Sequence, residues 1–193
     1  MTILDMTGRA CPLPVIHAKK AIKAARPGET VSILVDNDAA RQNLQKMAEG
    51  LGHEFSHESQ NDGAILVGIK ISAGGRALED DGAGLVVAIG RNSLGGANEE
   101  LGQTLMKSFI FTLTELDPPP EHLLFFNGGV WLTTAGAATV DDLAALAAKG
   151  SQIGTCGACL NYFKLTDKLA VGQVTNMLAI VSAMAQARKL INL

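Results

Sequence analysis

Aromatic residues are scarce in this chain of 193 residues, which has one tryptophan, one tyrosine and six phenylalanines. A core must therefore be built from aliphatic side chains, and an apolar share of 47% is ample for one. Cysteine is scarce too, because one of the three cysteines stands alone and two lie close together. This pattern does not form the disulfide framework of a small secreted protein. The length fits one large domain or two small ones.

Long apolar runs and a basic excess are also missing. No run approaches the roughly 18 apolar residues of a membrane helix, and the N-terminus lacks the pattern of a signal peptide. The sequence therefore predicts a cytoplasmic protein that has no membrane partner. The net charge is −3, and neither half has the basic excess of a dedicated nucleic-acid binder. Nucleic acid is thus not an expected partner.

The most informative segment is Cys11-Pro12-Leu13-Pro14, which follows a strand-like run and a turn at Thr7-Gly8-Arg9. Pro12 is expected at the first helical position, where its missing N–H costs nothing. Cys11 then lies at a helix N-terminus, where backbone N–H groups and the helix dipole favour the thiolate. The segment predicts an exposed, activated cysteine. The alternative is a structural helix start with an idle thiol.

Local patterns predict a first domain at residues 1–72, a two-layer βαβαββ sandwich with two helices on one face. Strands are expected at 2–6, 29–36, 53–59 and 63–71, and helices at 12–25 and 38–50. Asp38 is the expected cap of the second helix. Asn61-Asp62-Gly63 is a hairpin turn signal. Residues 73–82 are rich in Gly and charge and predict a linker.

This first domain resembles the small sulfur carriers called TusA or SirA-like proteins. The features that carry the resemblance are Asp5, Gly8, the Cys11-Pro12-x-Pro14 motif and the closing strand. The resemblance implies that Cys11 accepts sulfur as a persulfide and passes it to a partner. We expect a cysteine desulfurase-like donor of sulfur or selenium. The chemistry calls for neither an organic cofactor nor a metal.

The second domain, 83–193, is expected to be an open, mostly parallel α/β sheet with helices on both faces. Strands are expected at 85–89, at 122–126, just before Cys156 and at 189–193, and helices at 98–116, 141–149 and 174–189. Function in such sheets gathers at the carboxyl ends of the strands. We expect Gly90–Gly96, Asn127–Thr134 and Cys156–Cys159 to lie on that rim.

Cys156-Gly157-Ala158-Cys159 is expected to follow a strand and open a helix, with both sulfurs on one face and close enough for a disulfide. In a persulfide relay, one thiol accepts sulfur and the other releases it. Thioredoxin-like exchange is less well supported, because no proline follows Pro120. Zinc binding lacks ligands, because the four histidines show no ligand spacing to the pair. The structural alternative is two buried thiols that serve as small apolar residues.

The second half resembles the DsrE/DsrF-like family. The resemblance is carried by Asn98–Gly102, Leu105–Lys107, Phe126–Val130, Cys156–Leu160 and Asp167–Gly172. That family often uses a single cysteine on this rim, which implies Cys156 as the accepting thiol and Cys159 as the resolving one. The order of the two halves resembles the YedF proteins, which are associated with sulfur transfer and selenium metabolism. Family members often form trimers or hexamers, which implies a homo-oligomer.

Two weaker signals concern other partners. Gly90-x-x-x-x-Gly95-Gly96 lacks the following Lys-Ser/Thr of a phosphate-binding loop and is better interpreted as a flexible rim loop. A basic cluster on the first helix, behind Cys11, would either dock an acidic partner or form a solvated face. Its members are Lys19, Lys20, Lys23 and Arg26.

We therefore predict a sulfur- or selenium-trafficking protein, a candidate sulfurtransferase. In this hypothesis Cys11 carries a persulfide or selenosulfide and exchanges it with Cys156 and Cys159 or with a partner protein. One alternative is an oligomeric regulatory module whose cysteines sense redox state. Another is a tRNA-thiolation accessory that contacts RNA through the basic cluster.

Overall fold

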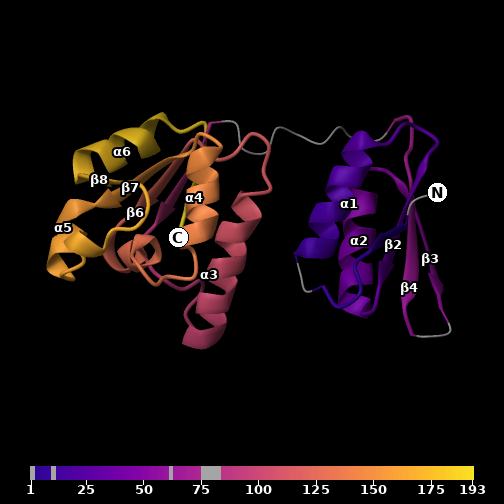
Figure 1. Cartoon of the computed structure of the whole chain (residues 1–193). Coiled ribbons are helices and arrows are strands. Elements are labelled where there is room, and N and C mark those ends of the chain that lie inside the picture. Colours follow the sequence, from indigo (N-terminus) through magenta and orange to yellow (C-terminus); the bar gives the residue numbers. More distant parts are fainter. Residues whose placement is uncertain (1–2, 10–11, 61–62, 75–83) are drawn as a thin grey trace. The chain divides into compact units, whose positions relative to one another are not determined.

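The computed structural model describes residues 3–9, 12–60, 63–74 and 84–193. The chain divides into two compact units, Met1–Glu79 and Asp80–Leu193 (Figure 1). Most of the predicted linker, 73–82, lies outside the described residues, so the linker stays a prediction. No helix among the described residues is both long enough and apolar enough to cross a membrane.

The N-terminal unit has the predicted βαβαββ order. Its elements are β1 (Ile3–Asp5), α1 (Leu13–Ala24), β2 (Thr30–Val35), α2 (Asp38–Gly50), β3 (Glu54–Ser59) and β4 (Ile65–Lys70). The strands form one mixed sheet in the order β1-β2-β4-β3, with β1 parallel to β2 and both other pairs antiparallel. The antiparallel pairing of β3 with β4 confirms the predicted hairpin, although Asn61 and Asp62 lie outside the described residues.

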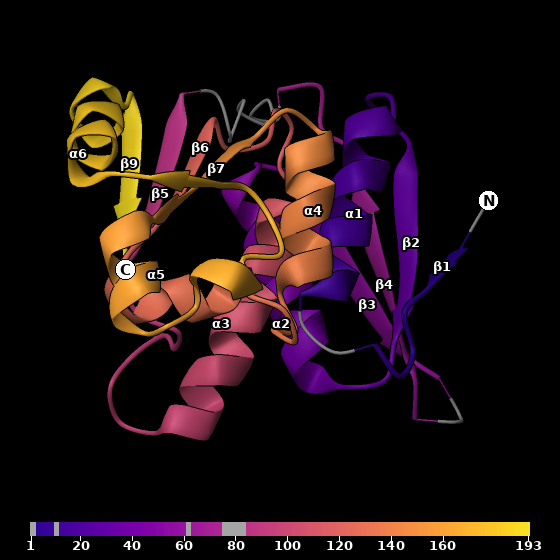
Figure 2. The same ribbon diagram turned by 60° about the vertical axis from the view of Figure 1, so that its left-hand side comes forward.

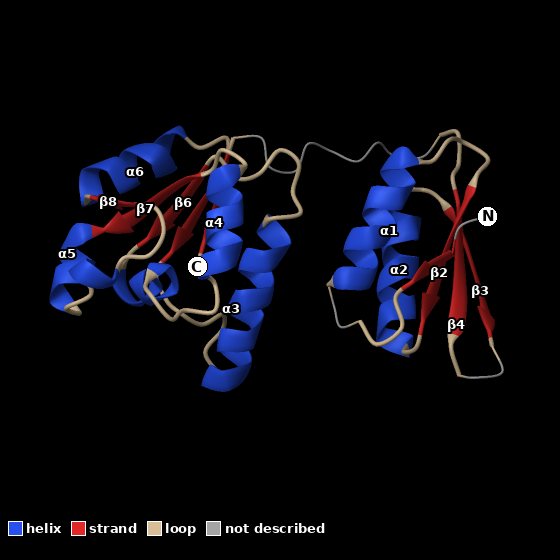
Figure 3. Ribbon diagram, viewed as in Figure 1, coloured by secondary structure: helices blue, strands red, loops and turns tan. Residues whose placement is uncertain are grey.

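Alternating aliphatic residues build the core of this unit. Val31, Ile33 and Val35 of β2 are buried in the same cluster as Ala18 and Ile22 of α1. Leu44 and Ala48 of α2, with Val67 and Ile69 of β4, complete that cluster. Side chains two apart in a strand share a face, so these positions bring the sheet against the helices (Figure 3).

Two expectations about helix starts were wrong by one residue. The cap of α2 is Asn37, not Asp38, because the Asn37 side chain accepts the Ala40 N–H at 2.8 Å. Asp38 is the first helical residue and places an acidic group in the first turn. In α1, Pro12 occupies the cap position and Leu13 begins the helix. In both cases local patterns place a helix end only to within a residue or two.

The C-terminal unit alternates strands and helices around a parallel sheet. Its elements are β5 (Leu85–Ile89), α3 (Glu99–Leu113), β6 (His122–Phe125), a 3-10 helix (Asn127–Thr133), α4 (Val140–Ala148), β7 (Gln152–Cys156), α5 (Gly157–Tyr162), a 3-10 turn (Thr166–Lys168), β8 (Gln173–Thr175), α6 (Met177–Gln186) and β9 (Lys189–Asn192). The strand order is β8-β7-β6-β5-β9, and every pair is parallel. Figure 2 shows β9 beside β5.

Neighbouring residues of the central strands belong to different clusters. Leu85, Val87 and Ile89 of β5 are buried with residues of α3 and α4. Val86 of β5 and Leu124 of β6 are buried with Ile180 of α6 instead. Because successive side chains of a strand point to opposite faces, α3 and α4 contact one face and α6 contacts the other.

The predicted helix at 174–189 was wrong at its start. Residues Gln173–Thr175 form the edge strand β8, and α6 begins at Met177 after Asn176, whose side chain accepts the Ala179 N–H. Apolar residues predominate from Val174 to Ala185, and no periodicity there separates strand from helix. Pairing of Gly154 with Gln173 and of Thr155 with Val174 decides for a strand.

Candidate functional site

The three predicted site residues differ in what the structure describes. Cys11 lies outside the described residues, together with Ala10. Cys156 ends β7, and Cys159 lies in the first turn of α5. The structure therefore brings Cys156 and Cys159 together. For Cys11, it describes only the segments on either side.

Two carboxylates hold the turn before Cys11. Asp5 Oδ1 accepts hydrogen bonds from the Thr7 N–H at 3.0 Å and from the Thr7 hydroxyl at 2.7 Å. Asp36, at the end of β2, accepts the Gly8 N–H at 2.6 Å. Gly8 has a φ of +69°, which glycine adopts without strain. The carboxyl end of β2 thereby anchors the turn that leads to Cys11.

These hydrogen bonds favour the charged carboxylates. The Gly8 N–H, and then the Asn37 side chain, hold the pKa of Asp36 below its usual range. The Thr7 backbone N–H, and then its hydroxyl, do the same for the pKa of Asp5. Asp5 and Gly8 were recognisable from the sequence, but Asp36 was not. Asp36 is 28 residues from Gly8, and only the parallel pairing of β1 with β2 brings the two together.

The helix behind Cys11 has an apolar face and a basic face. Ala18 and Ile22 are buried in the core, whereas Lys20, Lys23 and Arg26 are exposed. Lys19 is half-buried. The basic cluster therefore lies along α1 and just beyond its C-terminal end.

The predicted rim of the C-terminal unit is confirmed. In the parallel sheet, Ile89 pairs with Phe125, and Phe125 pairs with Thr155, so β5, β6 and β7 end at the same edge. The segments that follow these strands are Gly90–Gly96, Asn127–Thr134 and Cys156–Cys159. The cysteine pair follows a strand and opens a helix, as predicted.

Burial distinguishes the two cysteines. Cys156 is 2% exposed and lies in the apolar cluster of Val86, Leu124 and Ile180. Cys159 is half-buried, contacts this cluster and also borders a second one that contains Leu160. Both are free thiols. Cys156 is thus buried, as the structural alternative expects, whereas Cys159 is not fully buried.

A backbone group from the neighbouring strand contacts Cys159. The Asn127 N–H donates to Cys159 Sγ at 3.1 Å. Asn127 has a φ of +46°, which lies in the left-handed region. The sequence did not predict this contact, because Asn127 and Cys159 are 32 residues apart.

Three effects act on the Cys159 thiol. Burial raises its pKa most strongly, the Asn127 N–H lowers it, and the interaction with the neighbouring Cys156 thiol raises it again. The net direction is upward, so the neutral thiol predominates at neutral pH. Such a thiol reacts through a small thiolate fraction, and the high pKa makes that thiolate intrinsically more nucleophilic.

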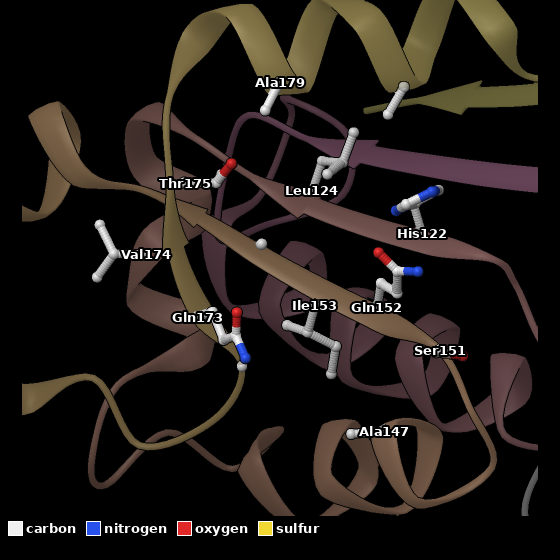
Figure 4. A pocket seen from close by; sticks show the side chains of 13 residues that line it. His122, Leu124, Ala147, Ser151, Gln152, Ile153, Gln173, Val174, Thr175 and Ala179 are labelled. Atoms are coloured by element: carbon white, nitrogen blue, oxygen red, sulfur yellow. The ribbon is translucent and has the colours of Figure 1, made fainter.

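Among the described residues, no group of three or more His, Cys, Asp or Glu side chains is placed to hold a metal ion. Two cavities lie elsewhere on the C-terminal unit. One, of about 460 Å³, borders β6, β7, β8 and α6 (Figure 4), and the other, of about 560 Å³, borders α3 and Trp131. Neither cavity is lined by Cys156 or Cys159.

Comparisons with solved structures give two partial similarities. A SirA-like protein from Desulfitobacterium hafniense is 45% identical, covers 37% of this chain and 99% of its own, and has a TM-score of 0.36. The ychN protein from E. coli is 16% identical, covers 56% of this chain and 97% of its own, and has a TM-score of 0.45.

Sequence comparison identifies the N-terminal unit. The family described as "Sulfurtransferase TusA" matches residues 2–71. The sulfur carrier protein TusA of Pseudomonas paraeruginosa is 30% identical over 71 residues, which span 37% of this chain and 90% of that protein. The matching segment includes the Cys11-Pro12-x-Pro14 motif and the turn held by Asp5 and Asp36. Through this segment, the chain belongs to the TusA family.

Proposed function

We propose that this protein traffics sulfur, with Cys11 as the residue that carries it. The observation that supports this most directly is the family match over residues 2–71, which contains the Cys-Pro-x-Pro motif. The related TusA protein of Pseudomonas paraeruginosa is a sulfur carrier protein. A carrier needs an accessible thiolate and no acid–base dyad.

The donor is a cysteine desulfurase-type enzyme. Its persulfide passes the outer sulfur to the Cys11 thiolate, so one S–S bond forms as another breaks and the donor thiolate leaves. The exposed basic residues of α1, among them Lys20 and Lys23, suit an acidic docking surface on such a partner. This step involves no net oxidation and needs no cofactor.

The C-terminal unit is the proposed second site of sulfur transfer. Its parallel sheet presents Cys156 and Cys159 at the carboxyl edge, where the pair would receive sulfur from Cys11 or from a partner protein. DsrE/DsrF-like character, a YedF-like role and selenium as the cargo belong to this proposal. The same cysteine thiol can accept either sulfur or selenium, so the donor enzyme determines which of the two elements is carried. A cytoplasmic location also belongs to it.

Self-association through α6 is part of the proposal. Met177, Leu178 and Val181 are 53%, 77% and 53% exposed, and no charged residue occurs between Val171 and Gln186. A helix that is apolar on every side is normally covered. A second copy of the chain is the proposed cover, giving a trimer or hexamer.

Intact-protein mass spectrometry after incubation with a cysteine desulfurase and cysteine tests the carrier role. Wild type should gain one sulfur atom, about 32 Da, as a persulfide. The adduct should be lost in Cys11→Ser and kept in a Cys156→Ser/Cys159→Ser double variant. An adduct that persists in Cys11→Ser and vanishes in the double variant would remove Cys11 as the carrier.

The redox-sensing module is the alternative from another class. It gains support from the adjacency of Cys156 and Cys159. In that case no variant would gain sulfur, and the pair would cycle between dithiol and disulfide under mild oxidants. The tRNA-thiolation alternative predicts binding of tRNA that weakens steeply with salt, since phosphate contacts release counterions.

A further inference from the structure

We infer that Cys159, not Cys156, is the thiol that accepts sulfur in the C-terminal unit, and that Cys156 resolves the persulfide. This assignment rests on the proposed sulfur-trafficking function and reverses the order that the family resemblance implies. It makes the backbone N–H of Asn127 part of the reaction site.

Access is the first reason. The attacking thiolate must approach the outer sulfur of an incoming persulfide in line with the S–S bond that breaks. Cys156 is 2% exposed and enclosed by Val86, Leu124 and Ile180, so a protein-borne or small persulfide does not reach it. Cys159 is half-buried and lies three residues further along, in the first turn of α5. Of the two thiols on this rim, Cys159 is therefore the more accessible.

A fixed hydrogen-bond donor is the second reason. The Asn127 N–H lies 3.1 Å from Cys159 Sγ, and a donor of this kind favours the thiolate over the thiol. No described hydrogen bond from a backbone N–H reaches Cys156 Sγ. The donor therefore offsets part of the effect of burial and stabilises the negative charge on Cys159 Sγ when this thiol reacts.

The backbone around Asn127 cannot easily turn away. The Phe126 N–H donates to the Ile89 carbonyl at 3.1 Å, and the Gly129 N–H donates to the Phe126 carbonyl at 2.9 Å. A Cβ on Gly129 would lie 2.1 Å from the Ile89 oxygen, so only glycine fits there. These contacts hold the turn in the conformation that points the Asn127 N–H at Cys159. Such preorganisation is what makes a donor effective where charge develops.

The chemistry balances in two steps. The Cys159 thiolate attacks the outer sulfur of a donor persulfide, a new S–S bond forms, and the donor leaves as a thiolate. The Cys156 thiolate then attacks Cys159 Sγ, which forms the Cys156–Cys159 disulfide and releases the transferred sulfur as hydrosulfide. Two cysteine thiols are oxidised and one sulfane sulfur is reduced. A dithiol reductant restores the pair for another turnover.

The test uses the full chain with Cys11→Ser, so that only the C-terminal pair responds, and sodium tetrasulfide as the sulfur source. In Cys11→Ser/Cys156→Ser, Cys159 should hold a stable persulfide, located by alkylation and peptide mass spectrometry. In Cys11→Ser/Cys159→Ser, loading of Cys156 should be slower by at least about tenfold, because a buried thiol reacts poorly. With both cysteines present, one hydrosulfide should appear for each disulfide.

Equal or faster loading of Cys156 would overturn the assignment, and so would the absence of a persulfide from Cys159. Both results leave the loading of Cys11 from a desulfurase unaffected, so the carrier proposal is judged separately.

Two glycine variants, compared in the background that lacks Cys11 and Cys156, test the role of the Asn127 N–H. Gly129→Ala should move the pH midpoint of Cys159 loading upward, because the displaced donor no longer favours the thiolate. Gly128→Ala should leave it unchanged, because its Cβ would meet no atom closer than 3.6 Å. An unchanged midpoint in folded Gly129→Ala would show that the donor has no part in loading. Should Gly129→Ala not fold, the comparison of the two cysteines still decides which thiol accepts.

Discussion

The carbonyl oxygen of Ile89 lies 2.1 Å from the point where a Cβ of residue 129 would stand. Gly129 therefore lets the segment after β6 cross directly against the end of β5. This close approach is what places Asn127, two residues earlier, beside Cys159.

A side chain at residue 129 should destabilise the C-terminal unit. Gly129→Ala forces either the turn or the end of β5 to move, and overpacking of this kind costs about 1–3 kcal/mol. Gly128→Ala, one residue away, should cost far less, because its Cβ has ordinary contacts. Urea denaturation of both variants measures the difference. Equal free energies of unfolding would contradict the close approach.

The cap of α2 should depend on Asn37 and not on Asp38. Asn37→Ala removes the acceptor of the Ala40 N–H and should lower the free energy of unfolding by about 1 kcal/mol. Asn37→Ser is the matched control, because a serine hydroxyl caps nearly as well. Thermal or urea unfolding measures both. If the two variants lose the same stability, the side-chain hydrogen bond contributes nothing.

The turn before Cys11 should loosen in acid. Hydrogen bonds lower the folded pKa of Asp36 and Asp5, so their contribution is present above the ordinary aspartate pKa of about 3.9. It is lost as the pH falls through the lower folded values, where the carboxylates become protonated. Amide exchange of Gly8, followed by NMR, should report the change.

Asp36→Asn provides the control for this pH dependence. The amide oxygen still accepts a hydrogen bond but does not titrate in this range. The Gly8 amide of the variant should then show no transition linked to residue 36. A transition identical to that of the wild type would assign it to another group.

Self-association should depend on the exposed face of α6. Leu178→Glu places a charge on a side chain that is 77% exposed, and it should shift the mass measured by light scattering towards that of one chain. Leu101→Glu is the matched control, because Leu101 is also an exposed leucine, on α3, at 57%. If the wild-type protein has the mass of one chain, the proposed self-association is wrong. Equal effects of both variants would move the interface away from α6.

The order of the elements was predictable because its signals are local. The alternation of Val31, Ile33 and Val35, and the apolar run Leu85–Ile89, each mark a strand without reference to the rest of the chain. The error at β8 has the same origin. Residues Gln173–Thr175 have no local pattern of their own and become a strand only by pairing with β7.

For the candidate site, the sequence by itself determined which residue types were available and where each stands along the chain. It identified the Cys-Pro-x-Pro motif, the pair Cys156 and Cys159, and the rim on which that pair lies. The tertiary structure decided which thiol of the pair is buried and which donor faces the other. Burial of Cys156 and the contact from Asn127 to Cys159 arise between segments that are distant in sequence. Only the packing of β5, β6 and β7 brings those segments together, because no local pattern encodes a contact over such a separation.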